Sequence, residues 1–445
     1  MKVAVGSFST ATATGFQQIT GLTFTAAAVF LISDTGTASG ILGEGPFNIG
    51  WGVPSTMVSA GGVKNGCIVV TAQDRSAAAN SGRRKSNTYC YIALSTAAPS
   101  LHSQAVFVST DATSFTLNWS TVGASATSLL CAYFAIGGDI TNADASTFTI
   151  STSVTSVNVT TGFAPDMVFA IHAGPGNVDS NLVDASYGFG FAAASTEQGG
   201  ITMSDDDGGN TMNSNCALSP TTTSTFIRGL VTSTATMNFE AQLNSTFASG
   251  FTIDITNAAA AAVTCFYLAL KGGEYNVGLM STPTATGTFT TIQQVYSAPR
   301  GYMFLGNSDA PTTAVVASAN CVIGCAQSST SMFAVGLSIQ DGTASSNVSR
   351  WYTTSTAWGG LHGTTNASAL VSSEFRYVDR SDNDVTNRLD TAAATSYGVL
   401  YATFGDTVQV VAYEPSTGLG ALISRNRFAR YKPTPRKSPP FRQWF

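Results

Sequence analysis

An internal repeat constrains the fold of this chain more than any other feature. Tyr133, Tyr267 and Tyr401 each lie in a short apolar run, and they are spaced 134 residues apart. The runs read CAYFAIGG at 131–138, CFYLALKGG at 265–273 and, less closely, LYATFGD at 400–406. Equal spacing of one pattern over such a distance predicts three copies of a single structural unit.

Other short patterns recur with the same order. Residues 28–32, 167–171 and 302–305 are three versions of one early apolar strand, and residues 114–119 match residues 250–255 just before the last strand. In the third copy this penultimate strand is not recognisable, and the polar, charged stretch 374–390 takes its place. The third unit is therefore predicted to be the most diverged.

Each unit is predicted to be all-β. Apolar and polar residues alternate at 106–108 and 148–154, and Thr, Val, Phe and Tyr are abundant, as in half-buried strands. Gly and Asn interrupt the pattern at short intervals, which leaves little room for helices. A unit of about 130 residues with roughly eight to ten short strands fits a β-sandwich, of jelly-roll-like type, with a barrel as the alternative. We expect three tandem sandwiches at 1–140, 141–274 and 275–415, with boundaries after the Gly-Gly pairs, and an extended arm at 416–445.

Composition favours a protein that stays packed against partners. Only 10% of the residues are charged, well below the roughly 25% usual in soluble domains, while Ser, Thr, Asn and Gly supply the polarity. The start of the chain alternates like a strand and does not resemble a secretory signal. The longest apolar stretch, 258–270, is shorter than the roughly 20 residues of a membrane span. These features predict a protein that is made in a cytoplasm and does not enter a membrane.

The seven cysteines are predicted to be buried and reduced. Several lie inside apolar strand patterns, where Cys acts as a small hydrophobic residue. Their positions are Cys67, Cys90, Cys131, Cys216, Cys265, Cys321 and Cys325.

The C-terminal arm differs sharply from the rest of the chain. Its last 21 residues hold seven of the twenty Lys and Arg and no acidic residue, whereas the remainder holds 13 basic and 25 acidic residues. Four prolines favour an extended path, and Arg and aromatic residues are frequent in interface hot spots. We expect the arm to dock on an acidic neighbouring subunit; packing on its own body is the alternative, and nucleic-acid binding is disfavoured by the acidic body. The predicted docking residues are Arg425, Arg427, Phe428, Arg430, Tyr431, Lys432, Arg436, Lys437, Phe441, Arg442, Trp444 and Phe445.

No pattern of catalytic chemistry is present. The three histidines lie at non-equivalent places, and no zinc, nucleophile-elbow, phosphate-loop or dinucleotide motif occurs. The sequence therefore predicts no enzyme and no catalytic, cofactor-binding or metal-binding residue. Asp205–Asp207 is predicted to be an exposed turn, with a cation site as the alternative. Arg83–Lys85 is predicted to be a solvated loop tip, and Trp351 and Trp358 are the candidates for a surface contact.

The chain resembles a repeated domain of tailed-bacteriophage virion proteins. The resemblance rests on GFAP at 162–165, GFTI at 250–253 and YLALKGG at 267–273, which are similar to the G-F-x-P, G-F-T-L and Y-L-A-L-G-G strands of those domains. The second unit matches best, the first lacks the proline, and the third keeps mainly Ala298-Pro299 and Tyr401. The resemblance does not cover the arm. It implies a structural protein of the virion, in the tail or on the head surface, and no catalytic residue.

Three functions follow as expectations. The first is a tail component of minor-tail, tip or fibre type, docked by its arm and serving host attachment. The second is a capsid decoration or head-fibre protein. The third is an adhesin module that binds host-surface glycans. Each places the protein in the virion, with other virion proteins as partners and with homo-oligomers in the particle.

Overall fold

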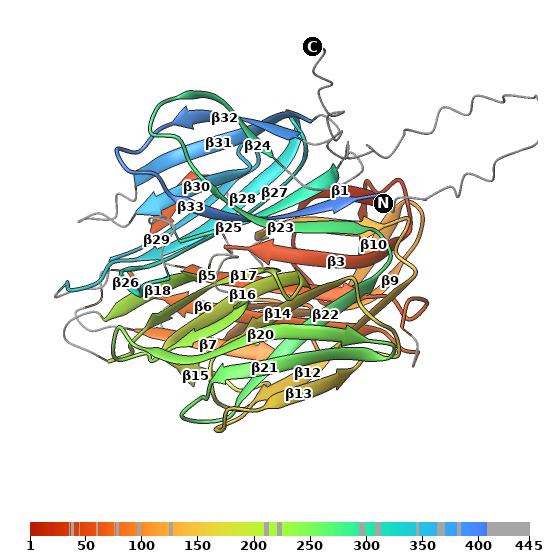
Figure 1. Ribbon diagram of the computed structural model, residues 1–445, viewed down its shortest axis with the longest axis horizontal. Helices are drawn as coiled ribbons and strands as arrows, with labels where there is room; N and C mark the ends of the chain where they lie inside the picture. The colour runs from red at the N-terminus through yellow and green to blue at the C-terminus, as the bar shows by residue number, and fades with distance from the viewer. Residues whose placement is uncertain are drawn as a thin grey trace, which may run out of the picture. The chain divides into compact units, whose positions relative to one another are not determined.

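The computed structural model describes residues 1–34, 36, 40–43, 45–58, 61–74, 76, 80–95, 99–123, 128–208, 213–219, 225–292, 299–307, 313–343, 347–362, 370–380 and 384–406. Residues 1–407 form one compact unit, and residues 408–445 form a second unit that lies outside the described residues. Every regular element in the described part is a β-strand, which confirms the all-β prediction (Figure 1). None of the described residues forms a helix that is long and apolar enough to cross a membrane.

The strands fall into three segments of the chain, each with the same sequence of elements. The first segment holds β1 (Lys2–Ser9), β2 (Gly15–Thr20), β3 (Ala26–Ser33), β4 (Gly40–Gly43), β5 (Gly45–Val53), β6 (Lys64–Ala72), β7 (Ser81–Ser86), β8 (Tyr91–Leu94), β9 (Leu101–Thr110), β10 (Ser114–Thr121) and β11 (Leu130–Gly137). The second segment holds β12 (Asn142–Ile150), β13 (Ser156–Thr160), β14 (Met167–His172), β15 (Leu182–Val183), β16 (Ala185–Ala194), β17 (Glu197–Asp205), β18 (Ser214–Ser219), β19 (Ile227–Leu230), β20 (Met237–Phe247), β21 (Gly250–Asn257) and β22 (Val263–Lys271). The third segment holds β23 (Glu274–Ser281), β24 (Gly287–Ile292), β25 (Pro299–Gly306), β26 (Val316–Ala317), β27 (Ala319–Ser328), β28 (Ser331–Ile339), β29 (Val348–Thr353), β30 (Trp358–His362), β31 (Leu370–Arg380), β32 (Asp384–Thr391) and β33 (Gly398–Gly405).

These strands build three seven-stranded and three four-stranded antiparallel sheets. In the first segment the four-stranded order is β2-β10-β9-β8, and in the other two it is β13-β21-β20-β19 and β24-β32-β31-β30. The seven-stranded orders are β1-β11-β3-β5-β6-β7-β15, β12-β22-β14-β16-β17-β18-β26 and β23-β33-β25-β27-β28-β29-β4. In each seven-stranded sheet the last strand comes from a different segment.

The repeated tyrosines have one place in this topology. Tyr133, Tyr267 and Tyr401 lie on β11, β22 and β33, which pair with the first strand of their own segment. Tyr133 lies opposite Gly6, and Tyr401 lies opposite Gly278. A Cβ at either glycine would meet the tyrosine ring at 2.2–2.5 Å, so the glycine makes room for the ring.

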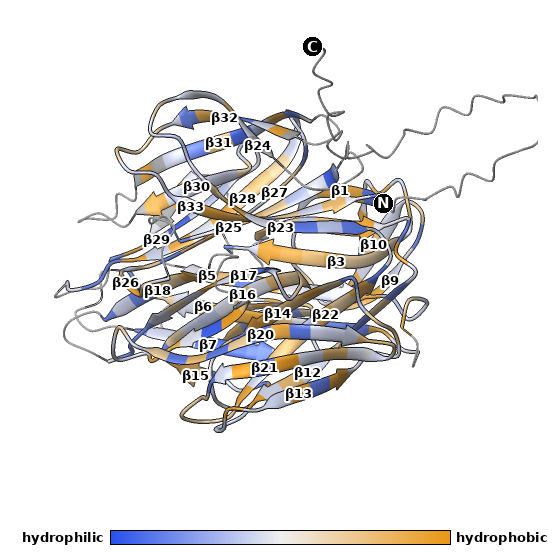
Figure 2. Ribbon diagram, in the orientation of Figure 1, coloured by the Kyte–Doolittle hydropathy of each residue, from blue (hydrophilic) through white to orange (hydrophobic). Residues whose placement is uncertain are grey.

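The two kinds of sheet differ in how their strands are buried. Strands β3, β5 and β14 of the seven-stranded sheets are buried along their whole length, because both faces of the sheet are covered. Strands β10 and β21 of the four-stranded sheets alternate between buried and less buried positions, because one face meets solvent. In Figure 2, β3 is accordingly apolar along its length, while the outer strands β31 and β32 mix polar and apolar residues.

The hydrophobic core has four main parts. Each four-stranded sheet packs on a seven-stranded sheet around a core of its own segment, which gives three β-sandwiches. The opposite faces of the three seven-stranded sheets meet in a central core drawn from all three segments. There the rings of Phe30 and Phe169 lie 4.9 Å apart, and those of Phe134 and Phe404 also lie 4.9 Å apart. The segments therefore share one interior.

The charged stretch of the third segment corrects a prediction. Residues 374–390 were expected to lack the penultimate strand, but they contain most of β31 and of β32, which pair with each other. Val385 and Leu389 point into the sandwich, whereas Arg388 and Asp390 are on the outer face and form an ion pair of 3.0 Å. The alternation of a half-buried strand persists, and only its outer residues are charged.

Candidate functional site

Exchanged strands join the three segments in a closed cycle. Strand β15 of the second segment pairs with β7 of the first, and β26 of the third pairs with β18 of the second. Strand β4 of the first segment pairs with β29 of the third, which closes the cycle. We call these contacts joint 1–2, joint 2–3 and joint 3–1. They are the candidate functional site, because they decide whether the chain is one body or three.

A homologous aspartate caps each joint. Ser81, Ser214 and Val348 are the first residues of β7, β18 and β29. Their backbone N–H groups donate to the Oδ1 atoms of Asp207, Asp341 and Asp74, each at 2.9 Å and each across a joint. A carboxylate that accepts a backbone N–H forms a charge-assisted bond, which is stronger than a neutral one. The same bond therefore fixes all three exchanged edges.

Cationic side chains reinforce all three joints, and in joint 2–3 Arg228 on β19 donates to the carbonyl oxygen of Thr313 at 3.2 Å. Arg83 on β7 donates to the carbonyl oxygens of Pro175 at 3.1 Å and Asp184 at 2.6 Å. Lys85 donates to the carbonyl oxygen of Gly174 at 2.7 Å, and burial lowers the pKa of its amine to about 8. In joint 3–1, Arg350 on β29 donates to the carbonyl oxygen of Asp34 at 2.7 Å. These side chains hold the loop that leads to the exchanged strand.

This placement corrects the prediction of a solvated loop tip at Arg83–Lys85. The three residues lie inside β7, where Arg83 is 7% exposed and Lys85 is fully buried. The sequence shows three cations beside a glycine, which is typical of an exposed loop. It does not show that a loop from another segment supplies carbonyl oxygens to bind them.

Each segment also covers the first strand of a neighbouring segment. These contacts lie at the opposite end of the strands from the capping aspartates. Val5 on β1 accepts a hydrogen bond of 2.6 Å from the Ser331 hydroxyl, and its N–H donates to Gln327 at 3.3 Å. Ala143 on β12 donates to the carbonyl oxygen of Met57 at 3.1 Å. An uncovered edge strand can pair with another chain, and these contacts reduce that risk.

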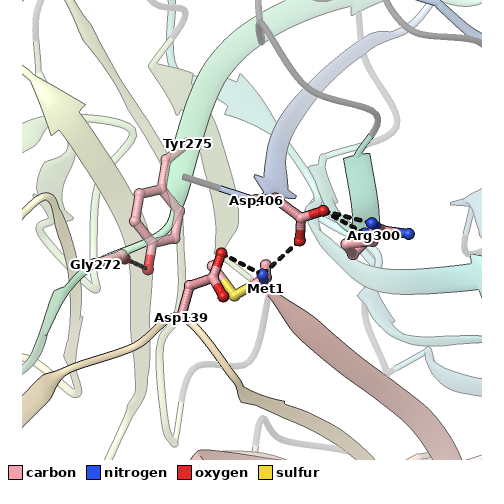
Figure 3. Close-up of polar contacts among 6 residues, drawn as sticks. All are labelled: Met1, Asp139, Gly272, Tyr275, Arg300 and Asp406. Atoms are coloured by element: carbon pink, nitrogen blue, oxygen red, sulfur yellow. Dashed lines mark hydrogen bonds and ion pairs between the residues drawn. The ribbon is translucent and has the colours of Figure 1, made fainter. Parts of the chain in front are cut away.

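Figure 3 shows a cluster of charges at this end of the first and third segments. The amino group of Met1 lies 2.7 Å from Asp139 Oδ2 and 2.5 Å from Asp406 Oδ1, and Arg300 pairs with the other oxygen of Asp406. Burial alone would raise the pKa of Asp406, but the bonds from Arg300 and the amino group outweigh burial and lower it. Asp406 is the last described residue of the third segment, and these contacts hold it in place.

The connection between the second and third segments is fixed beside this cluster. The Tyr275 hydroxyl donates to the carbonyl oxygen of Gly272 at 2.8 Å (Figure 3). Asp166 accepts from Lys271 Nζ at 2.9 Å and from the Gly272 N–H at 2.8 Å. The short connection therefore follows one path between β22 and β23.

The tryptophans expected to offer a surface contact are buried. Trp351 is 5% exposed and Trp358 is 0% exposed, and both belong to the core of the third sandwich. The ring of Trp358 stacks on that of Phe375 with centroids 5.7 Å apart. The Trp-Gly-Gly pattern suggested a loop, but the glycines belong to β30 together with Trp358.

The other predicted site residues have different outcomes. The acidic turn is not simply exposed, since Asp205 is 2% exposed and Asp207 caps joint 1–2. The seven cysteines are free and buried, which confirms that prediction. Within the part of the chain that the structure describes, no group of three or more His, Cys, Asp or Glu side chains gathers as metal ligands would. All the predicted docking residues of the arm, from Arg425 to Phe445, lie outside the described residues.

Three glycines that the sequence reasoning missed allow the sheets to approach closely. Gly50, Gly190 and Gly324 lie at the same place on β5, β16 and β27. A Cβ at these positions would lie 2.1, 1.8 and 1.7 Å from a backbone carbonyl oxygen. In each segment that oxygen belongs to the residue that directly precedes the edge strand of the four-stranded sheet. Each follows an apolar residue within a strand pattern, so their recurrence in the three units was a usable signal.

No protein-family model matches the chain, and no curated protein matches it either. The function must therefore be argued from the joints, the surface and the composition of this chain.

Proposed function

We propose that this chain is a structural subunit of a tailed-bacteriophage virion, placed in the tail as a minor-tail, tip or fibre-type component. In this proposal, three copies of one jelly-roll-like sandwich form the body, and the basic C-terminal arm docks the body on an acidic virion protein. The observation that carries the proposal is the closed cycle of exchanged strands. Every segment is held by both others, so the body has the fixed geometry that a permanent component of a particle needs.

The charge distribution supports docking through the arm. The described part of the chain ends at Asp406, which Arg300 and the amino group of Met1 hold in place. The residues that follow include the seven cations of the last 21 residues, while the rest of the chain is acidic overall. Opposite charges speed the encounter of two subunits and set their orientation.

The structure weakens the argument for a glycan-binding adhesin. Stacking on a sugar requires an exposed aromatic face, and Trp351 and Trp358 are buried in the third sandwich. A capsid decoration protein would use the same body and arm, so the position of the protein in the particle separates it from a tail component.

Deleting residues 425–445 is expected to leave the body folded and to remove the protein from particles. The thermal unfolding temperature of the purified variant should stay that of the full chain, while purified particles should contain less than about a tenth of the normal amount, since hot-spot residues carry most binding energy. A matched variant keeps the length of the arm but replaces its seven Lys and Arg by Gln. Labelled antibody on intact particles then distinguishes tail from head. Normal incorporation of the truncated chain would contradict the proposal.

A further inference from the structure

One buried carboxyl breaks the pattern of the central core at joint 1–2. Ala72, Asp205 and Ile339 are the last residues of β6, β17 and β28, and each is paired in register with the first residue of the following strand. Ala72 and Ile339 belong to the central core. Asp205 takes the homologous place with a carboxyl group that is only 2% exposed.

The surroundings of Asp205 connect it to both segments. The Ser214 hydroxyl donates to Asp205 Oδ1 at 2.5 Å. The Ser81 hydroxyl, from the first segment, donates to the backbone oxygen of Asp205 at 3.3 Å and accepts from the Ala185 N–H at 3.2 Å. Ser81 is also the residue whose N–H is capped by Asp207, so Asp205 and the cap of joint 1–2 act on the same residue.

The other charged groups near Asp205 come from all three segments. Asp206 and Asp207 follow β17, and Asp184, just before β16, accepts from the Asp207 N–H at 2.9 Å. From β7, Arg83 donates to the backbone oxygen of Asp184 and Lys85 donates to that of Gly174. From the third segment, Asp341 accepts from the Ser214 N–H.

Burial is the largest cause of a pKa of about 7 for Asp205. The hydrogen bonds from Ser214 and Ser81 lower this pKa, while the charges of Asp206 and Asp184 raise it further. Burial also raises the pKa of Asp34, the buried acid of joint 3–1, but there the charge of Arg350 opposes the rise. The acid of joint 1–2 therefore lies among like charges, unlike that of joint 3–1.

We propose that joint 1–2 is a proton-dependent latch whose titrating group is Asp205. With the proton bound, a neutral carboxyl fills the apolar position and the joint is closed. When the proton leaves, a buried charge lies beside Asp184, Asp206 and Asp207, and repulsion loosens β15 and the Asp207 cap from β7. The homologous residues Ala72 and Ile339 cannot ionise, so only one of these three strand ends carries a titrating group.

The sign of the pH dependence follows from the raised pKa of Asp205 in the folded state. The folded state holds the Asp205 proton up to about pH 7, whereas the unfolded chain releases it near the ordinary value of 3.8. The contribution of this group to stability is therefore complete below about pH 4 and is lost as the pH rises to about 7. Between about pH 4 and pH 7, the titration of Asp205 should lower the ratio of folded to unfolded protein by about tenfold for each pH unit, or about a thousandfold over the whole range.

The test compares the full chain with Asp205→Asn between pH 4 and pH 9. Asparagine keeps the shape and the acceptor for Ser214 but cannot ionise, and Asp205→Ala copies the first segment in case the amide does not fold. Denaturant unfolding gives the pH profile of each variant. Hydrogen exchange at the Ser81 N–H, corrected for its intrinsic pH dependence, reports the opening of the joint itself. Asp111→Asn is the matched control, because hydrogen bonds from the Thr113 N–H and the Ser114 hydroxyl hold the pKa of Asp111 below its ordinary value.

From about pH 4 to pH 7, we expect the stability of the full chain to fall relative to that of Asp205→Asn. Hydrogen exchange at the Ser81 N–H should become faster in the full chain. Asp111→Asn should keep the pH profile of the full chain over this range. Parallel profiles of the full chain and Asp205→Asn would overturn the proposal. So would a rise in stability at pH 8 on adding Ca²⁺ that Asp205→Asn lacks, because the carboxylate would then be a cation ligand.

Discussion

Replacing Phe169 by alanine is expected to lower the free energy of unfolding of the whole body by about 3–5 kcal/mol. Phe169 belongs to the second segment, but its ring contacts rings from all three. Its centroid lies 4.9 Å from that of Phe30 in the first segment, 6.4 Å from Phe189 in its own, and 6.2 Å from Phe404 in the third. Alanine would leave a cavity in the shared interior, and no segment can refill that cavity alone.

The positions of the tryptophans allow fluorescence to test this prediction. Trp51 and Trp119 lie in the first segment, Trp351 and Trp358 in the third, and Trp444 in the arm, so the second segment has none. Trp fluorescence during denaturant unfolding therefore reports only on segments that do not carry the substitution. We expect the midpoint to fall in Phe169→Ala and to stay near that of the full chain in Phe16→Ala, where the ring is 75% exposed. An unchanged fluorescence midpoint in Phe169→Ala would mean that the segments unfold independently.

Gly190→Ala is expected to destabilise the second sandwich by about 3 kcal/mol or more, at the upper end of overpacking effects. The added Cβ would lie 1.8 Å from the backbone oxygen of Phe226, which directly precedes β19. Backbone atoms cannot move aside as a side chain can, so β16 and the start of β19 would have to separate.

Gly336→Ala provides the matched control for this substitution. Its Cβ would first meet the Val322 side chain, at 3.0 Å, and a side chain can shift by a few tenths of an ångström. Thermal unfolding of both variants should show a loss several times larger for Gly190→Ala. Equal losses would indicate that the cost comes from adding any side chain to a buried strand glycine, and not from the approach of the two sheets.

The sequence was sufficient to predict the class of fold because its main signals are local. Alternation and β-branched residues identify strands wherever they occur, and Tyr133, Tyr267 and Tyr401 take one place on β11, β22 and β33. Even β32, which was missed, keeps alternation once its outer charges are set aside. The alternation depends only on neighbours along the chain, and the repeated tyrosine pattern can be recognised in the sequence itself.

The joints could not be predicted because their partners are distant. The exchanged strands β15 and β26 are two residues long, and no pattern of that length distinguishes a strand from a loop. Arg83 and Lys85 look solvated until the carbonyl oxygens of Pro175 and Gly174 are placed beside them. Burial of Trp358 likewise depends on Phe375. In each case the physical cause is a contact across sheets, which spacing along the chain does not encode.

Cutting the chain between the first and second segments tests the interlocked body most directly. A protease site can be inserted between Gly138 and Asp139, which are both exposed, between β11 and β12. After cleavage, we expect the two fragments to elute together at the size of the intact chain and to separate only in denaturant, because β15, β4 and the central core still hold them. Fragments that elute separately under native conditions would contradict the account, since the chain would then be a string of independent sandwiches.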